Sequence, residues 1–69
     1  MYYEPIDGDY LNGHFIYLCK RDNKFDVLVV RRDGKKVLEK HYKTYQGAER
    51  RYTIECAHYR ALEEANWFD

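Results

Sequence analysis

Short apolar runs separated by turn-forming dipeptides dominate the first two thirds of the chain. His14 to Lys20 and Phe25 to Arg32 are rich in aromatic and β-branched residues. Runs of this length and composition favour β-strands over helices. Lys35 to Tyr42 returns after Asp33-Gly34, a pair that favours a tight hairpin. The pattern predicts an antiparallel β-meander over residues 14 to 43, with its second strand in the centre.

The register of the second hairpin depends on the length of its loop, which the sequence leaves open. A two-residue type I′ loop at Asp33-Gly34 pairs Asp26 with His41. A three-residue loop with Gly34 in the left-handed conformation pairs Asp26 with Lys40 instead. Either register places an acid opposite a potential cation, and such a cross-strand pair contributes only about 0.2–1 kcal/mol. Charge therefore does not choose between the two registers.

Residues 1 to 13 are predicted to form an N-terminal arm with turns. Asp7-Gly8 and Asn12-Gly13 are dipeptides that tolerate positive φ, so each predicts a tight turn. A short edge strand through Asp9, Tyr10 and Leu11 would make the sheet four-stranded. The sequence leaves open whether residues 2 to 11 join the sheet.

The last third of the chain, residues 44 to 68, predicts one long helix. Thr44 is a good N-cap residue, and the segment after it has no proline and many helix formers. At about 100° per residue, apolar positions fall in two stripes on opposite sides of this helix. The first stripe holds Tyr45, Ala48, Tyr52, Cys56 and Tyr59, and the second holds Ile54, Ala57, Ala61, Ala65 and Phe68.

Two opposed stripes raise the question of what covers the second, because one sheet covers only one side of a helix. One interpretation is that tyrosines, with an apolar body and a polar tip, tolerate a half-wet surface. The other is that one stripe docks on the sheet while the other meets a second copy or a partner. We therefore treat the second stripe as a candidate interface, which in a homodimer would bring helices close together at Ala57, Ala61 and Ala65.

These elements predict a single α+β domain, a three- or four-stranded antiparallel meander packed against one C-terminal helix. A chain of 69 residues has a thin core, but its aromatic content of 17% supplies large buried areas without metal or disulfide. No segment approaches the roughly 18 consecutive apolar residues of a membrane span. With no secretory signal and only two cysteines, Cys19 and Cys56, we expect reduced thiols in a cytoplasmic protein.

The formal net charge is zero, but the charges are unevenly distributed. Residues 20 to 51 hold eleven bases and five acids, while acids outnumber bases in the segments before and after. A β-hairpin can enter a major groove, and cations on it can neutralise phosphates. Lysine-rich edge strands also occur simply because they oppose aggregation of sheets. The candidate nucleic-acid-binding residues are Arg31, Arg32, Lys35, Lys36, Lys40 and Lys43.

The sequence indicates neither catalysis nor a bound metal. Cys56 and His58 are two apart on the predicted helix and point about 160° away from each other, so they cannot share an ion. No Gly-rich phosphate loop occurs, and the chain is too small to build a nucleophile pocket easily. We expect a non-enzymatic module without metal or cofactor.

The stretch Phe25 to Arg51, FDVLVVRRDGKKVLEKHYKTYQGAERR, resembles the arm-type DNA-binding domain at the N-terminus of many phage and transposon tyrosine recombinases. The shared features are the apolar strand, the D-G-K-K hairpin, and an aromatic residue followed by Thr44 and then Ala48-Glu49. The chain departs from the family in lacking a recombinase catalytic domain and in having Phe25 where a Trp is common. The resemblance implies the ethylene-response-factor fold, three strands with one helix behind, with DNA contacts from Arg31, Arg32, Lys36, Lys40 and Lys43.

The leading hypothesis is a small binding module, encoded by a phage or mobile element, that contacts DNA or RNA through its basic β-hairpin. The alternative is a protein-interaction module, such as an anti-defence inhibitor or an adaptor, that dimerises and docks on a larger protein. The second helix stripe and the acidic ends of the chain motivate this alternative, because an acidic surface suits a basic partner.

Overall fold

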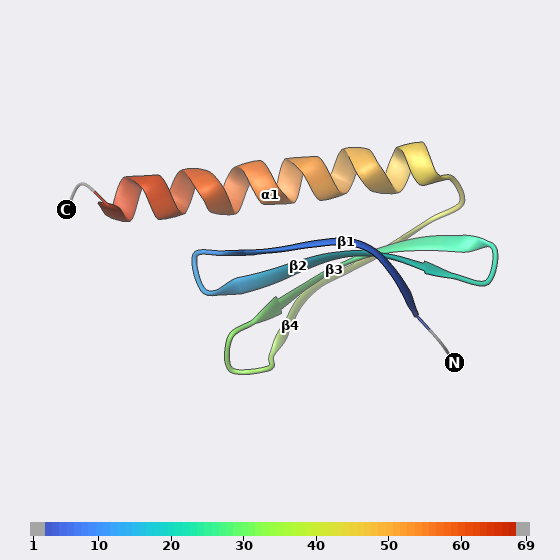
Figure 1. The fold of residues 1–69 in the computed structure, drawn as a ribbon, viewed down its shortest axis with the longest axis horizontal. Helices are drawn as coiled ribbons and strands as arrows, with labels where there is room; N and C mark the ends of the chain where they lie inside the picture. Colours follow the sequence, from blue (N-terminus) through green and yellow to red (C-terminus); the bar gives the residue numbers. More distant parts are fainter. Residues whose placement is uncertain (1–2, 68–69) are drawn as a thin grey trace.

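In the computed structural model, which describes residues 3 to 67, a four-stranded antiparallel sheet carries one long helix on one face (Figure 1). Each strand pairs with its neighbour in sequence, in the order β1-β2-β3-β4. The predicted α+β meander with a C-terminal helix is thus confirmed. The elements are β1 (Glu4–Leu11), β2 (His14–Arg21), β3 (Lys24–Arg31), β4 (Lys36–Tyr42) and α1 (Tyr45–Trp67).

The N-terminal segment is a full strand of the sheet and not an arm. β1 pairs with β2 from Glu4 opposite Lys20 to Leu11 opposite His14. The turn between them is the predicted one at Asn12-Gly13, whose φ angles of 50° and 74° are both in the left-handed region. The four-stranded form of the predicted sheet is therefore the one the structure adopts.

The turn predicted at Asp7-Gly8 was wrong, because both residues lie inside β1. The strand instead has an irregularity between Pro5 and Asp7, where the register with β2 shifts by one residue. A Cβ added to Gly8 would lie 3.4 Å from Cδ1 of Tyr17. The glycine thus provides the flat backbone on which the Tyr17 ring lies.

The tip of the β3–β4 hairpin has the geometry of the three-residue loop. Gly34 has a φ of 95°, and its N–H donates to the carbonyl of Arg31 at 2.8 Å. The N–H of Arg31 in turn donates to the carbonyl of Lys35, also at 2.8 Å. This combination of a tight turn and a left-handed glycine is common in three-residue hairpins.

The body of the same hairpin has the register that the sequence assigned to the two-residue loop. The pairing shifts between Val29, opposite Leu38, and Val30, opposite Lys36, so that Val37 is an extra residue. This bulge places Asp26 opposite His41. Both loop alternatives were thus partly correct, each for a different part of the hairpin.

The helix docks on the sheet through the first of its two predicted stripes. Ala48, Cys56 and Tyr59 are buried, with Tyr52 partly buried beside them. The residues of the sheet that meet this stripe come from alternating strand positions, as a pleated sheet requires. They form two adjoining clusters, one with Leu11, Ile16 and Val29 and the other with Leu18 and Val27.

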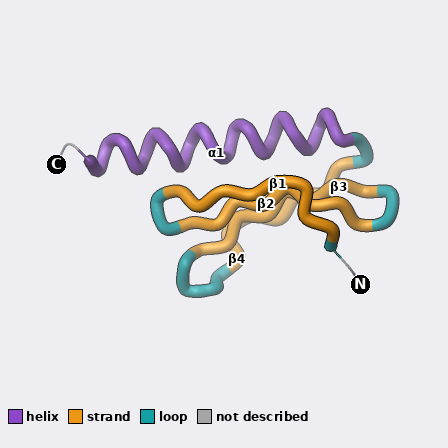
Figure 2. The backbone as a smooth tube through the Cα atoms, in the orientation of Figure 1, coloured by secondary structure: helices purple, strands orange, loops and turns teal. Residues whose placement is uncertain are grey.

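Two polar contacts and a ring stack hold the second half of α1 over the β1–β2 turn. The His14 ring stacks on Tyr59 with centroids 4.4 Å apart. Arg60 forms an ion pair with Asp9 at 3.3 Å, and the N–H of Asn12 donates to Glu63 at 2.8 Å. Beyond this turn the helix extends past the end of the sheet (Figure 2).

The second stripe lies on the outer side of α1, away from the sheet. Ile54 is 54% exposed, and Ala57, Ala61 and Ala65 are also exposed, while Phe68 lies outside the described residues.

Within residues 3 to 67, no helix has the length and apolar content needed to cross a bilayer.

Two isoleucines allow a matched test of where the core lies. Ile16 is fully buried between β2 and α1, so we expect Ile16→Ala to lower the free energy of unfolding by about 2–5 kcal/mol. Ile54→Ala removes the same atoms from an exposed helix position and should change stability by less than about 0.5 kcal/mol. Urea denaturation followed by circular dichroism measures both. Equal losses of unfolding free energy in the two variants would contradict the packing of α1 over Ile16.

Candidate binding surface

The face of the sheet opposite α1, here called the open face, is covered by no other element of the described chain (Figures 1 and 2). Its residues alternate with those of the core and form cross-strand rows. In the first row Tyr10 pairs with Phe15 and Phe15 with Val30. In the second row Tyr17 lies between Gly8 and Leu28.

Three aromatic rings form a continuous ladder on the open face. The centroids of Tyr10 and Phe15 are 4.6 Å apart with their planes tilted by 50°. Phe15 and Tyr17 are nearly parallel, with an interplanar angle of 4° and centroids 6.1 Å apart. Tyr10 is 46% exposed and Phe15 37%, so the ladder presents ring surface to its surroundings.

A buried carboxylate occupies the next row of the open face. The Asp26 side chain is completely buried although no layer covers it. Its Oδ1 lies 2.5 Å from Nδ1 of His41, and its Oδ2 lies 3.4 Å from Nε of Arg21. Nε2 of His41 meets the Glu39 carboxylate at 3.2 Å. Because burial of an unpaired carboxylate is costly, these two partners make the position of Asp26 tolerable.

Cys19 stands opposite Asp26 in the register, and its thiol is free. Burial, and secondarily the charge of Asp26, raises the pKa of Cys19 above its ordinary value. Burial likewise raises the pKa of the other free thiol, Cys56. A thiol with a raised pKa is mainly protonated at neutral pH and is therefore a poor nucleophile.

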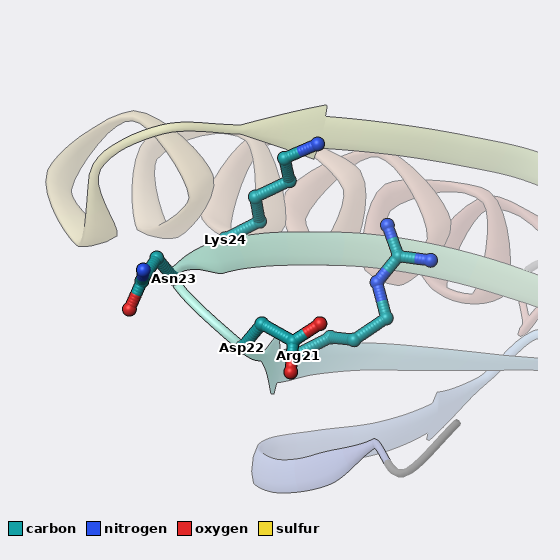
Figure 3. Close-up of a pocket in the computed structure, with 4 residues that line it drawn as sticks. All are labelled: Arg21, Asp22, Asn23 and Lys24. Atoms are coloured by element: carbon teal, nitrogen blue, oxygen red, sulfur yellow. The ribbon is translucent and has the colours of Figure 1, made fainter.

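The β2–β3 turn ends the open face with two cations. Arg21 and Lys24 pair across this turn, and with Asp22 and Asn23 they line a shallow hollow of about 310 Å³ (Figure 3). The Arg21 guanidinium also lies 5.4 Å from the ring centroid of Tyr3, within the range of a cation–π contact. Asp22 contributes a carboxylate, so the hollow holds both signs of charge.

Two of the six predicted nucleic-acid-binding residues form ion pairs within their own hairpin. Arg31 makes two hydrogen bonds to Asp33, the shorter at 2.6 Å. The Arg31 guanidinium, helped by the N–H of Lys35, lowers the pKa of Asp33 to about 2. Lys36 pairs with Glu39 at 2.6 Å, and this hydrogen bond raises the pKa of Lys36.

The other four predicted cations do not form one cluster. Arg32 and Lys35 lie in the β3–β4 loop. Lys40 pairs with Val27, a core residue, and so lies on the helix side of the sheet edge. Lys43 follows β4 at its far end, about 20 Å along the strand from Lys36. The β3–β4 loop, with Lys36 beside it on the open face, is the one place where several of these cations meet.

Neither a metal centre nor a known relative indicates a function. Within the described part of the chain, no group of three or more His, Cys, Asp or Glu side chains is arranged to hold a metal ion. Comparison of the chain with protein-family models, curated protein sequences and solved structures gives no match. Function is therefore inferred from the surfaces themselves.

The pairing of Asp26 with His41 predicts that loss of the imidazole lowers stability and that removal of the carboxylate charge restores part of it. His41→Ala leaves a fully buried carboxylate with Arg21 as its cationic partner, so we expect a loss of about 3 kcal/mol in the free energy of unfolding at pH 7. Asp26→Asn in the His41→Ala background removes the buried charge and should recover part of that loss. Urea denaturation of the single and double variants measures both effects.

His58→Ala is the matched control, because His58 is an exposed histidine on α1. We expect a change of less than about 0.5 kcal/mol for this variant. A loss for His41→Ala no larger than that of the control would show that the carboxylate does not depend on the imidazole.

Proposed function

We propose that the chain is a small non-enzymatic module that binds nucleic acid with its β3–β4 loop and the adjoining end of the open face. The observation that carries this proposal is the placement of Arg32 and Lys35. Among the described residues neither has an ion-pair partner, and the N–H of Arg32 donates to the Gly13 carbonyl at 2.9 Å. The loop thus lies beside the β1–β2 turn, next to the row that holds Tyr10 and Phe15.

The distribution of acids supports the same surface. Asp7 and Asp9 pair with Leu18 and Ile16, two core residues, so these carboxylates lie on the helix side of the sheet. Asp9 is further neutralised there by Arg60. On the open face the buried Asp26 contacts Arg21 and His41, and Glu39 pairs with Lys36. A phosphate that approaches the loop therefore meets cations whose charge exceeds that of the nearby acids.

A salt series tests phosphate neutralisation directly. The double variant Arg32→Ser/Lys35→Ser should weaken binding of a 12-nucleotide oligonucleotide and reduce the slope of log affinity against log salt by about 1.4–1.8, because two phosphate contacts are lost. Fluorescence anisotropy at several salt concentrations measures the slope.

The matched control is Lys20→Ser/Arg50→Ser, which removes the same charge from exposed positions outside the open face and the loop. This control should leave the slope nearly unchanged. Absence of binding by the wild-type chain, or an equal fall in slope for the control, would refute the proposed surface.

A second candidate function is association of two chains through the second stripe of α1. Ile54 at 54% and Leu62 at 40% are large apolar side chains exposed on the same helix. The exposed alanines Ala57 and Ala61 beside them leave room for close approach of another helix. The partner proposed for this stripe is a second copy of the chain, and a dimer of this kind could also dock on a larger protein.

Sedimentation equilibrium of the chain tests this second candidate. Ile54→Asp and Ala61→Glu place a charge in the stripe and should weaken dimerisation by more than about tenfold in Kd. Thr53→Asp places the same charge at a neighbouring exposed position and should leave the dimer intact. A wild-type chain that stays monomeric at all concentrations would exclude this interface.

A further inference from the structure

We infer that the nucleic acid recognised by this chain is unpaired, with its bases stacked on the ladder of Tyr10, Phe15 and Tyr17. This inference rests on the proposed nucleic-acid function and names the form of the ligand. The ladder lies toward the end of the open face that adjoins the β1–β2 turn, and the cations of the β3–β4 loop lie at this same end. A strand could therefore place its bases on the rings while its phosphates reach the loop.

Exposed aromatic rings on a flat sheet suit bases for a physical reason. Every base has a π-face, so stacking on a protein ring is favourable without sequence-specific hydrogen bonds. Phe15 and Tyr17 lie almost parallel to each other, and Tyr10 adds its ring on the neighbouring strand. Leu28 and Val30, half-buried beside these rings, extend the apolar floor.

A duplex fits this face poorly, because its base faces are hidden within the stack. A major groove is about 12 Å wide and admits a helix or a two-stranded ribbon. Four strands at about 4.8 Å spacing put the axes of the two edge strands about 14 Å apart, before side chains are added. β3 is also paired with β2 over its full length, from Arg31 to Lys24, so β3 and β4 do not project as a free ribbon.

A second copy of the chain is a poorer occupant of the open face than a polyanion. Arg32 and Lys35 lie at one end of the face. Arg21 and Lys24, which Figure 3 shows with Asp22, lie at the other end. Two copies that face each other with equal ends together would bring Arg32 and Lys35 of both copies, unpaired within the described residues, into contact, and like charges in an interface are unfavourable. A chain of phosphates meets the Arg32 and Lys35 end with the complementary charge.

The experiment compares three probes by fluorescence anisotropy: an unstructured 12-nucleotide pyrimidine strand, its matched duplex, and a strand of equal length without bases. The wild-type chain should bind the pyrimidine strand at least about tenfold more tightly than either other probe. Phe15→Leu and Tyr10→Leu keep an apolar side chain but remove the π-face, and each should weaken binding of that strand by about 5- to 100-fold. In both variants the slope of log affinity against log salt concentration should equal that of the wild type.

Tyr45→Leu is the matched control, because Tyr45 is 41% exposed but lies on α1 and contacts Phe25. We expect its affinity for the pyrimidine strand to equal that of the wild type. Circular dichroism and the urea midpoint verify that each variant is folded. If a ladder variant does not fold, amide shifts of Phe15 and Tyr17 in the wild-type chain on addition of the strand provide the second measurement, and unmoved shifts would overturn the inference.

The remaining outcomes separate this inference from the proposed function. Unchanged affinity in Phe15→Leu, with loss of binding in Arg32→Ser/Lys35→Ser, would overturn stacking and leave nucleic-acid binding standing. Equal affinity of the wild type for the duplex or the strand without bases would also overturn stacking alone. No binding of any probe would remove both proposals. A dimer that Phe15→Leu converts to a monomer, without oligonucleotide binding, would show that a second copy covers the face.

Discussion

One helix can cover only one face of a four-stranded sheet, and the rest of this structure depends on that constraint. Ile16, Val27 and Val29 are fully buried because Ala48, Tyr52, Cys56 and Tyr59 of α1 lie over them. Within residues 3 to 67 nothing covers the opposite face in this way, so its side chains must be stable while partly in water. Partly exposed aromatic rings and charges at both ends of the face meet this requirement, and the same features make the face available to a ligand.

The strands and the helix were predictable because their local signals agree with their tertiary roles. The apolar runs of β2 and β3 and the helix formers after Thr44 each favour the structure in which they are found. β1 was only partly predictable, since Pro5, Asp7 and Gly8 are poor strand formers. Pairing with β2 overrides that local preference. The role of Gly8 beneath the Tyr17 ring is visible only once the register is known.

The candidate binding surface was harder to predict, because β2 is apolar at successive positions. Ile16 and Leu18 face the helix while Phe15 and Tyr17 face outward, and composition does not say which set is covered. The register adds a second uncertainty, since the bulge at Val37 decides that His41 meets Asp26. Counts of basic residues along the chain indicated the β3–β4 hairpin as the candidate. They could not tell which cations its own acids neutralise.

Fewer cations are available to a ligand than the chain contains, because carboxylates of the chain already pair with several of them. Arg31 pairs with Asp33 and Lys36 pairs with Glu39, so these two cations stabilise the β3–β4 hairpin. Arg21 lies beside Asp26 and stabilises this buried carboxylate. A phosphate that binds one of these cations must compete with a carboxylate already in contact with it, which reduces the net gain. Arg32 and Lys35 carry no such cost within the described residues. Two unpaired cations give modest electrostatic affinity by themselves, so stacking on the neighbouring rings would have to supply much of the binding energy.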